Sequence, residues 1–147
     1  STNRMMFVAK QDPLSSSSQL TVSVGNKFPI TEVGYGKWFF AYMDDAEKEQ
    51  LYKDALHELE RSGVESYERE LESIRKAGVL VSRKEGVCAV SCPIFAHNQT
   101  VLGVIAILGM SAYLEDKKLE EVTSLLMDIS KRCSLHFADT SISDVVR

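Results

Sequence analysis

The sequence has 147 residues, of which 44% are hydrophobic and 26% are charged, and these values are typical of one globular domain with its own core. A net charge of −4 argues against nucleic-acid binding by the chain itself, since phosphate backbones attract clustered Lys and Arg. The longest apolar stretch, Val101 to Met110, is about half as long as a membrane span, and three cysteines cannot complete a disulfide framework. We therefore expect one cytoplasmic domain over residues 1–147, with no membrane segment.

The first third of the chain predicts two short strands and the start of a helix. Residues 5–10 and 19–24 are the expected strands, and the serines at 15–18 lie in a polar loop between them. Gly34 and Gly36 then bracket a helix start, where they leave backbone N–H groups free.

Two more helices are expected before the middle of the chain. One begins at Asp44 or Asp45, carries an apolar stripe at helical spacing and is expected to end at Gly63. The other covers residues 67–76, with Leu71 on its inward side and a break at the following Ala-Gly pair.

The second half predicts strands followed by one long helix. We expect strands at 79–82, 87–95 and 101–110, a helix at 115–137 and a loose tail after it. The two long strands flank a short turn and so predict an antiparallel hairpin, and the very apolar 101–110 strand is expected to be buried on both faces. Runs of strands separated from runs of helices favour an α+β fold, with helices packed on an antiparallel sheet.

Cys88 and Cys92 lie four residues apart in a predicted strand. On one strand face they are about 13 Å apart, too far for one metal ion or for a disulfide. Two buried thiols are the simplest interpretation. The alternative is a single reactive thiolate, which would make the domain a thiol enzyme similar to a methionine sulfoxide reductase.

Other patterns typical of enzymes or metal sites are weak. Cys133 and His136 share a helix face, but a metal ion would need further ligands from elsewhere in the chain. The sequence has no GxSxG elbow and no phosphate-binding glycine loop. The aromatic run at 38–40 is expected to pack in the core. We therefore expect no catalytic residue, no metal and no cofactor.

The predicted hairpin has one face with unusually small side chains. Ala89 and Ser91 alternate with the two cysteines, and Ala106 lies on the partner strand. Small side chains on a buried face leave room either for a ligand or for a closely packed helix, and the residues alone leave both possibilities open.

Three stretches in order resemble the effector-binding domain of IclR-type bacterial transcription regulators. They are VGNKFPITEVGYGKWFFAYM (24–43), ESIRKAGVLVSRKEGVCAVSCPIFAHNQTVLGVIAILG (72–109) and SAYLEDKKLEEVTSLLMDISKRCS (111–134). The resemblance covers about residues 5 to 138 and depends on order and spacing, since no single motif is diagnostic. It implies a GAF-like fold, a homodimer or homotetramer, and a small-molecule effector that modulates DNA binding by a winged helix-turn-helix domain not present in this chain.

The resemblance also implies where the effector would bind. Together with Ser91, which the hairpin pattern adds, the expected ligand-binding residues are Val33, Gly34, Ser82, Val87, Ala89, Ser91, Ala106 and Leu108. An acidic residue is common in the family where Ser82 stands, Cys is common at Ala89, and serines are usual at Ala106 and Leu108.

These departures predict an apolar or aromatic effector, with or without a carboxylate, or a weak or absent one. Hydrogen bonds to a carboxylate would come from backbone N–H groups at 34–36, or from Ser82 or Ser91. A dimerisation module without a ligand is a further alternative. The family's first helix and strand have no counterpart before Ser1, and the 83–86 turn is short, so the chain is either an isolated or an incomplete domain.

Overall fold

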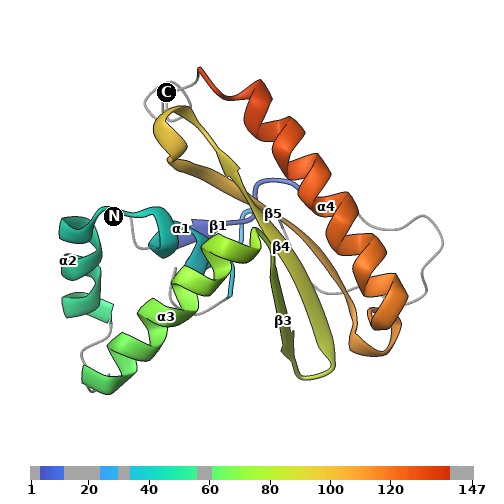
Figure 1. The fold of residues 1–147 in the computed structure, drawn as a ribbon, viewed down its shortest axis with the longest axis horizontal. Coiled ribbons are helices and arrows are strands. Elements are labelled where there is room, and N and C mark those ends of the chain that lie inside the picture. Colours follow the sequence, from blue (N-terminus) through green and yellow to red (C-terminus); the bar gives the residue numbers. More distant parts are fainter. Residues whose placement is uncertain (1–3, 12–23, 30–33, 56–60, 140–147) are drawn as a thin grey trace.

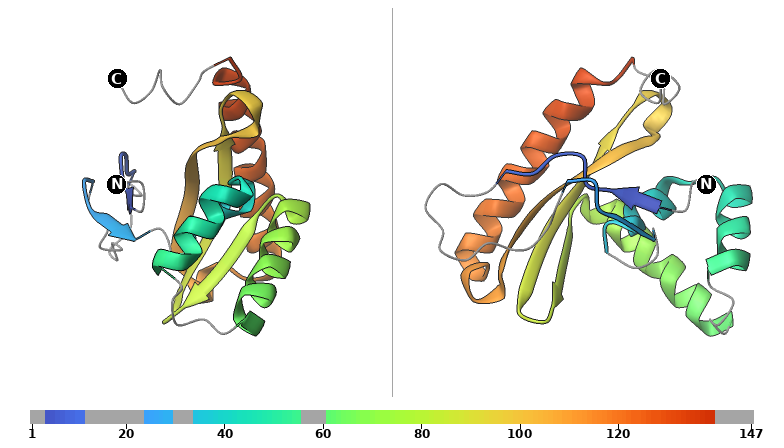
Figure 2. Two further views of the ribbon diagram at one scale, coloured as in Figure 1. Left: turned by 90° about the vertical axis from the view of Figure 1, so that its left-hand side faces the viewer. Right: turned by 180° about the vertical axis from the view of Figure 1, so that it is seen from behind.

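The computed structural model describes residues 4–11, 24–29, 34–55 and 61–139. At its centre lies an antiparallel sheet in the order β3-β4-β5, formed by β3 (Leu80–Lys84), β4 (Val87–Phe95) and β5 (Val101–Met110). The long helix α4 (Asp116–His136) covers one face of this sheet, and α1 and α3 lie on the opposite side (Figures 1 and 2). The expected α+β class is confirmed.

Within the described residues, three helices precede the central sheet in the chain. They are α1 (Gly36–Tyr42), α2 (Asp45–Ala55) and α3 (Arg61–Ala77). Phe40 and Ala41 of α1 pack on Leu71 of α3, and Arg75 donates a hydrogen bond to the carbonyl oxygen of Ala41 over 2.6 Å. This bond satisfies an acceptor at the end of α1 and fixes the short helix against α3.

The start of α3 differs from the prediction. The helix begins at Arg61 rather than at residue 67, so Gly63 lies inside it and does not end the preceding helix. Gly63 is in the first turn of the helix, where the backbone N–H groups make no hydrogen bond within the helix. A glycine is therefore better tolerated there than in the helix interior.

A separate two-stranded sheet contains β1 (Arg4–Met6) and β2 (Lys27–Pro29), which pair antiparallel. Residues 19–23 of the second predicted strand lie outside the described residues. Its last residue, Val24, stands in a turn that continues at Gly25 with a φ of 91°, and a short strand that the sequence did not predict begins after it. The strand was not predicted because it contains Pro29, and a proline in a sequence pattern argues against a strand.

The hairpin strands have the predicted bounds, and the β3–β4 turn is tighter than expected. Glu85 and Gly86 have φ values of 52° and 78°, the positive values that a two-residue hairpin turn of type I′ requires. β3 therefore continues to Lys84, two residues beyond its expected end. Between β4 and β5 the chain forms a short 3-10 helix, η1 (His97–Gln99).

The face of the sheet under α4 has a closed apolar core. Cys88, Val90 and Cys92 of β4 pack there with Leu114 and Leu126. Ser130 and Ser134 of α4 also hydrogen-bond the backbone of β4.

β5 is less buried than predicted. Residues 102–109 are only half-buried, and Met110 is 43% exposed. The expectation of burial on both faces is wrong because β5 is an edge strand of the described sheet. No helix in the described part of the chain combines the length and the apolar character that crossing a bilayer requires.

Candidate functional site

The strand register brings the expected site residues of the hairpin to one face of the sheet. Ser82 pairs with Ala89, and Ala89 pairs on its other side with Leu108. Directly paired residues of antiparallel strands project to the same side, so these three side chains form a cross-strand row. We call Ser82, Ala89 and Leu108 the outer row, and all three are half-buried.

A second row lies two residues further along each strand. It contains Leu80, Ser91 and Ala106, which are paired in the same way. We call these three residues the inner row. Val87 lies on the other side of the outer row, between Lys84 and Met110. All hairpin residues of the expected site therefore share one face.

Gly34 lies against this same face. A Cβ atom built on Gly34 would be 3.1 Å from Ser82 Oγ and 3.7 Å from Leu80 Cδ2. The backbone before α1 thus approaches the sheet closely enough that a side chain at this position would have to displace its neighbours. Val33 lies outside the described residues.

The contact between Trp38 and Ser91 was not predicted from the sequence. The Trp38 side chain is fully buried, and its indole N–H donates a hydrogen bond to Ser91 Oγ over 3.0 Å. The sequence placed Trp38 in the core and Ser91 on a roomy face, without joining the two. The available signal was chemical, because a buried indole N–H needs an acceptor and hydroxyls on small-residue faces can supply one.

The cysteines of β4 face away from this site. Both thiols are free and fully buried on the α4 face, as the alternation predicted. Burial raises the pKa of Cys92 to about 11. A nucleophilic thiol needs a lowered pKa and some exposure to solvent, so the surroundings of Cys92 do not favour thiol catalysis.

Two cavities are found away from the expected site. The larger, of about 640 Å³, lies between the C-terminal half of α4 and the end of β4, beside Tyr42, Phe95, Met127 and Lys131. The smaller, of about 320 Å³, lies along α4. Neither is lined by any residue of the expected site that the structure describes.

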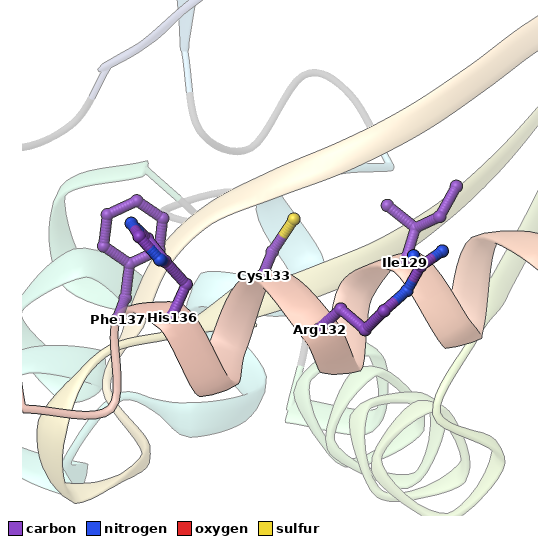
Figure 3. A pocket seen from close by; sticks show the side chains of 5 residues that line it. All are labelled: Ile129, Arg132, Cys133, His136 and Phe137. Carbon is purple, nitrogen blue, oxygen red and sulfur yellow. The ribbon is translucent and has the colours of Figure 1, made fainter.

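The smaller cavity contains the Cys133 and His136 pair that the sequence singled out (Figure 3). The His136 ring lies edge-to-face with Phe137 at a centroid distance of 4.9 Å, and Arg132 is also part of the wall. Over the described residues, no three His, Cys, Asp or Glu side chains come close enough together to hold a metal ion.

The sequence matches one protein-family model, described as bacterial transcriptional regulator IclR C-terminal, over residues 1–135. No curated protein is significantly similar to the chain.

Several solved structures with a similar fold are described as transcriptional regulators. They include an IclR transcriptional regulator from Alicyclobacillus acidocaldarius, with 24% identity and a TM-score of 0.78 over 91% of this chain and 56% of that chain. The Thermotoga maritima IclR has 24% identity and a TM-score of 0.71 over 91% of this chain and 58% of that one. The C-terminal domain of a Vibrio cholerae regulator has 20% identity and a TM-score of 0.73, over 88% of this chain and 78% of that one. The chain therefore spans little more than half the length of the first two.

Proposed function

Because the chain belongs to the family of bacterial transcriptional regulator IclR C-terminal domains, we propose that it binds a small-molecule effector. Binding changes DNA recognition by a winged helix-turn-helix domain carried elsewhere in the regulator. The chain acts as one sensory domain over residues 1–147, in the cytoplasm. The family and the similar structures are regulators rather than enzymes.

One observation carries this proposal, namely that the expected residues gather on one half-buried sheet face. The outer row and Val87 remain partly accessible, and the backbone at Gly34 closes over Ser82. A ligand here would contact a sheet and the start of a helix at the same time. It could therefore shift their relative position, which is how binding at one site changes another.

The polarity of the face indicates the class of effector. Ser82 has the one partly accessible hydroxyl among the described residues of the two rows, since Ser91 is buried and its Oγ accepts the Trp38 N–H. The remaining side chains are aliphatic. An apolar or aromatic molecule fits this surface, with a carboxylate, if it has one, at the Ser82 end.

A thermal-shift screen of the purified chain tests the proposal. Benzoate and cyclohexanecarboxylate should raise the melting temperature, whereas oxalate and malonate should not. Gly34→Leu should abolish the shift, because even a Cβ there would be 3.1 Å from Ser82 Oγ. Gly103→Ala is the matched control, since a Cβ on Gly103 meets no atom within 4 Å. Stabilisation by the short dicarboxylates alone would contradict the proposed ligand class.

We also propose that the domain assembles with a second copy, as a homodimer or a homotetramer. Tyr113, Leu125 and Leu135 are large apolar side chains exposed on or next to α4. Light scattering after size exclusion should give a mass of two or four chains. Leu125→Glu and Leu135→Glu should reduce it.

A second candidate function is an oligomerisation module that binds no effector. The burial of Trp38 favours it, because the indole already fills the space over Ser91. Wild-type protein that is oligomeric, yet unresponsive to every compound in the screen, would support this alternative.

A further inference from the structure

We propose that Trp38 sets the size of the effector pocket, because its indole ring occupies the part of the pocket above Ser91, at the centre of the inner row. The inference rests on the proposed function and names the residue that decides which effectors fit. The wild-type site is thereby restricted to compact ligands above the outer row.

The ring occupies a place with the features of a ligand subsite. Ser91 is 1% exposed, and its hydroxyl accepts the one hydrogen bond that the indole can donate. Ala106 is paired with Ser91, so a methyl and a hydroxymethyl group form the floor. Side chains this small leave a depression in a sheet face, and the Trp38 ring fills it with its one polar atom hydrogen-bonded to Ser91.

The occupied part is continuous with the proposed site. The inner and outer rows are two residues apart along each strand, which corresponds to about 7 Å. Trp38 and Gly34 lie in adjoining turns at the start of α1, since the Lys37 N–H donates a hydrogen bond to the Gly34 carbonyl and the Trp38 N–H donates one to the Tyr35 carbonyl. The indole therefore lies one turn along from Gly34 and would form the end wall of a site above the outer row.

Burial distinguishes Ser91 from the residues around it. Ser91 is sealed from solvent, whereas Leu80 and Ala106 of the inner row are half-buried, as are Ser82, Ala89 and Leu108. A ligand above the outer row would stop at the face of the indole. Removing the ring should join the two spaces and admit a longer aromatic molecule, with its ring over Ser91 and its polar end near Ser82.

Calorimetric titration of Trp38 variants with indole and indole-3-acetate tests this arrangement. Trp38→Ala should bind indole, whereas the wild type should not. Indole-3-acetate should bind Trp38→Ala at least tenfold more tightly than indole does, because its carboxylate reaches Ser82. Ser82→Ala in the Trp38→Ala background should remove that added affinity.

The hydrogen bond supplies a second readout that a purely structural role would not change. Indole should bind Trp38→Ala about fivefold more tightly than benzothiophene, which has no N–H, since one such bond contributes about 1 kcal/mol. Ser91→Ala in the same background should remove this preference. If Trp38→Ala does not fold, Trp38→Leu keeps an apolar side chain and should bind phenylacetate more tightly than the wild type does.

Two results would overturn the inference. One is equal binding of indole-3-acetate to the wild type and to the Trp38 variants. The other is a variant that binds indole but gains nothing from the acetate group, because its cavity would then be separate from the outer row. If the proposed function itself is wrong, the result differs, because no compact carboxylate will then raise the melting temperature of the wild-type protein.

Discussion

Leu114 packs directly against the backbone of Gly109. A Cβ atom on Gly109 would lie 2.8 Å from Leu114 Cδ1, which is well inside van der Waals contact. Gly109 is paired with Cys88 on the α4 face, and Leu114 is buried just before α4 begins. The glycine therefore lets the chain fold from β5 back onto the sheet, with α4 close enough to cover the thiols.

Gly109→Ala should destabilise the domain. The added methyl overpacks the contact with Leu114, which costs about 1–3 kcal/mol. Gly103→Ala is the control on the same strand, and it should be neutral or stabilise by up to about 1 kcal/mol because a Cβ there meets open space. Urea unfolding measures both, and equal effects would show that the Leu114 contact does not limit the packing of α4.

Two serines of α4 hydrogen-bond the edge of β4 beyond the end of β3. Ser130 Oγ donates to the Pro93 carbonyl oxygen over 2.5 Å, and Ser134 Oγ accepts the Phe95 N–H over 3.0 Å. β3 pairs with β4 only as far as Ser91, so this part of the edge has no strand on that side among the described residues.

Ser130→Ala and Ser134→Ala should each lower the free energy of unfolding by about 1–3 kcal/mol, because each leaves a backbone group of β4 without its partner. Ser124→Ala is the matched control, since Ser124 is exposed on the same helix. It should stabilise slightly, by up to about 0.5 kcal/mol, because Ala has the higher helix propensity. Denaturant titrations in which all three variants behave alike would contradict this role of the serines.

Alternation along the hairpin was enough to predict which residues share a face. Side chains of a strand point alternately to its two sides, so the separation of Cys88 and Cys92 from Ala89 and Ser91 follows from the sequence. Burial could not be predicted in the same way. The apolar run at 101–110 has the pattern of a central strand but lies at an edge of the described sheet. Position in a sheet depends on pairing with distant segments, which a local pattern does not contain.

The contents of the site were also beyond sequence reasoning. The small residues left open either a space for a ligand or a closely packed helix, and the structure places Trp38 of α1 over Ser91. A pattern specifies the face on which a side chain lies, whereas the distance between a helix and a sheet depends on how all the intervening residues pack. Gly34 shows the same limit, since its 3.1 Å approach to Ser82 becomes visible only in three dimensions.

Thiol labelling should separate the three cysteines. Cys133 is partly exposed, whereas Cys88 and Cys92 are fully buried, so iodoacetamide at neutral pH should modify Cys133 first. Intact mass should show one adduct on the native chain and three after denaturation, and Cys133→Ala should remove the native adduct. Fast modification of Cys88 or Cys92 in the native state would instead favour the thiol-enzyme alternative.

The stability of the domain should fall above pH 9 because of Cys92. Burial raises the pKa of this thiol from the ordinary 9.0 to about 11. The unfolded chain then loses the thiol proton at a lower pH than the native state does. The contribution of Cys92 to the free energy of unfolding is therefore complete below pH 9 and is lost as the pH rises to 11.

Cys92→Ala isolates this contribution from those of Tyr35, Tyr42 and Tyr67, whose pKa values burial also raises. The wild type should be the more stable protein at pH 8, because the substitution leaves a small cavity. The difference in free energy of unfolding between the wild type and Cys92→Ala should shrink by about 2–3 kcal/mol between pH 9 and pH 11, because the pKa of Cys92 is raised from 9.0 to about 11. Urea unfolding at several pH values measures the difference, and a constant gap over this range would mean that Cys92 is hydrated in the native state.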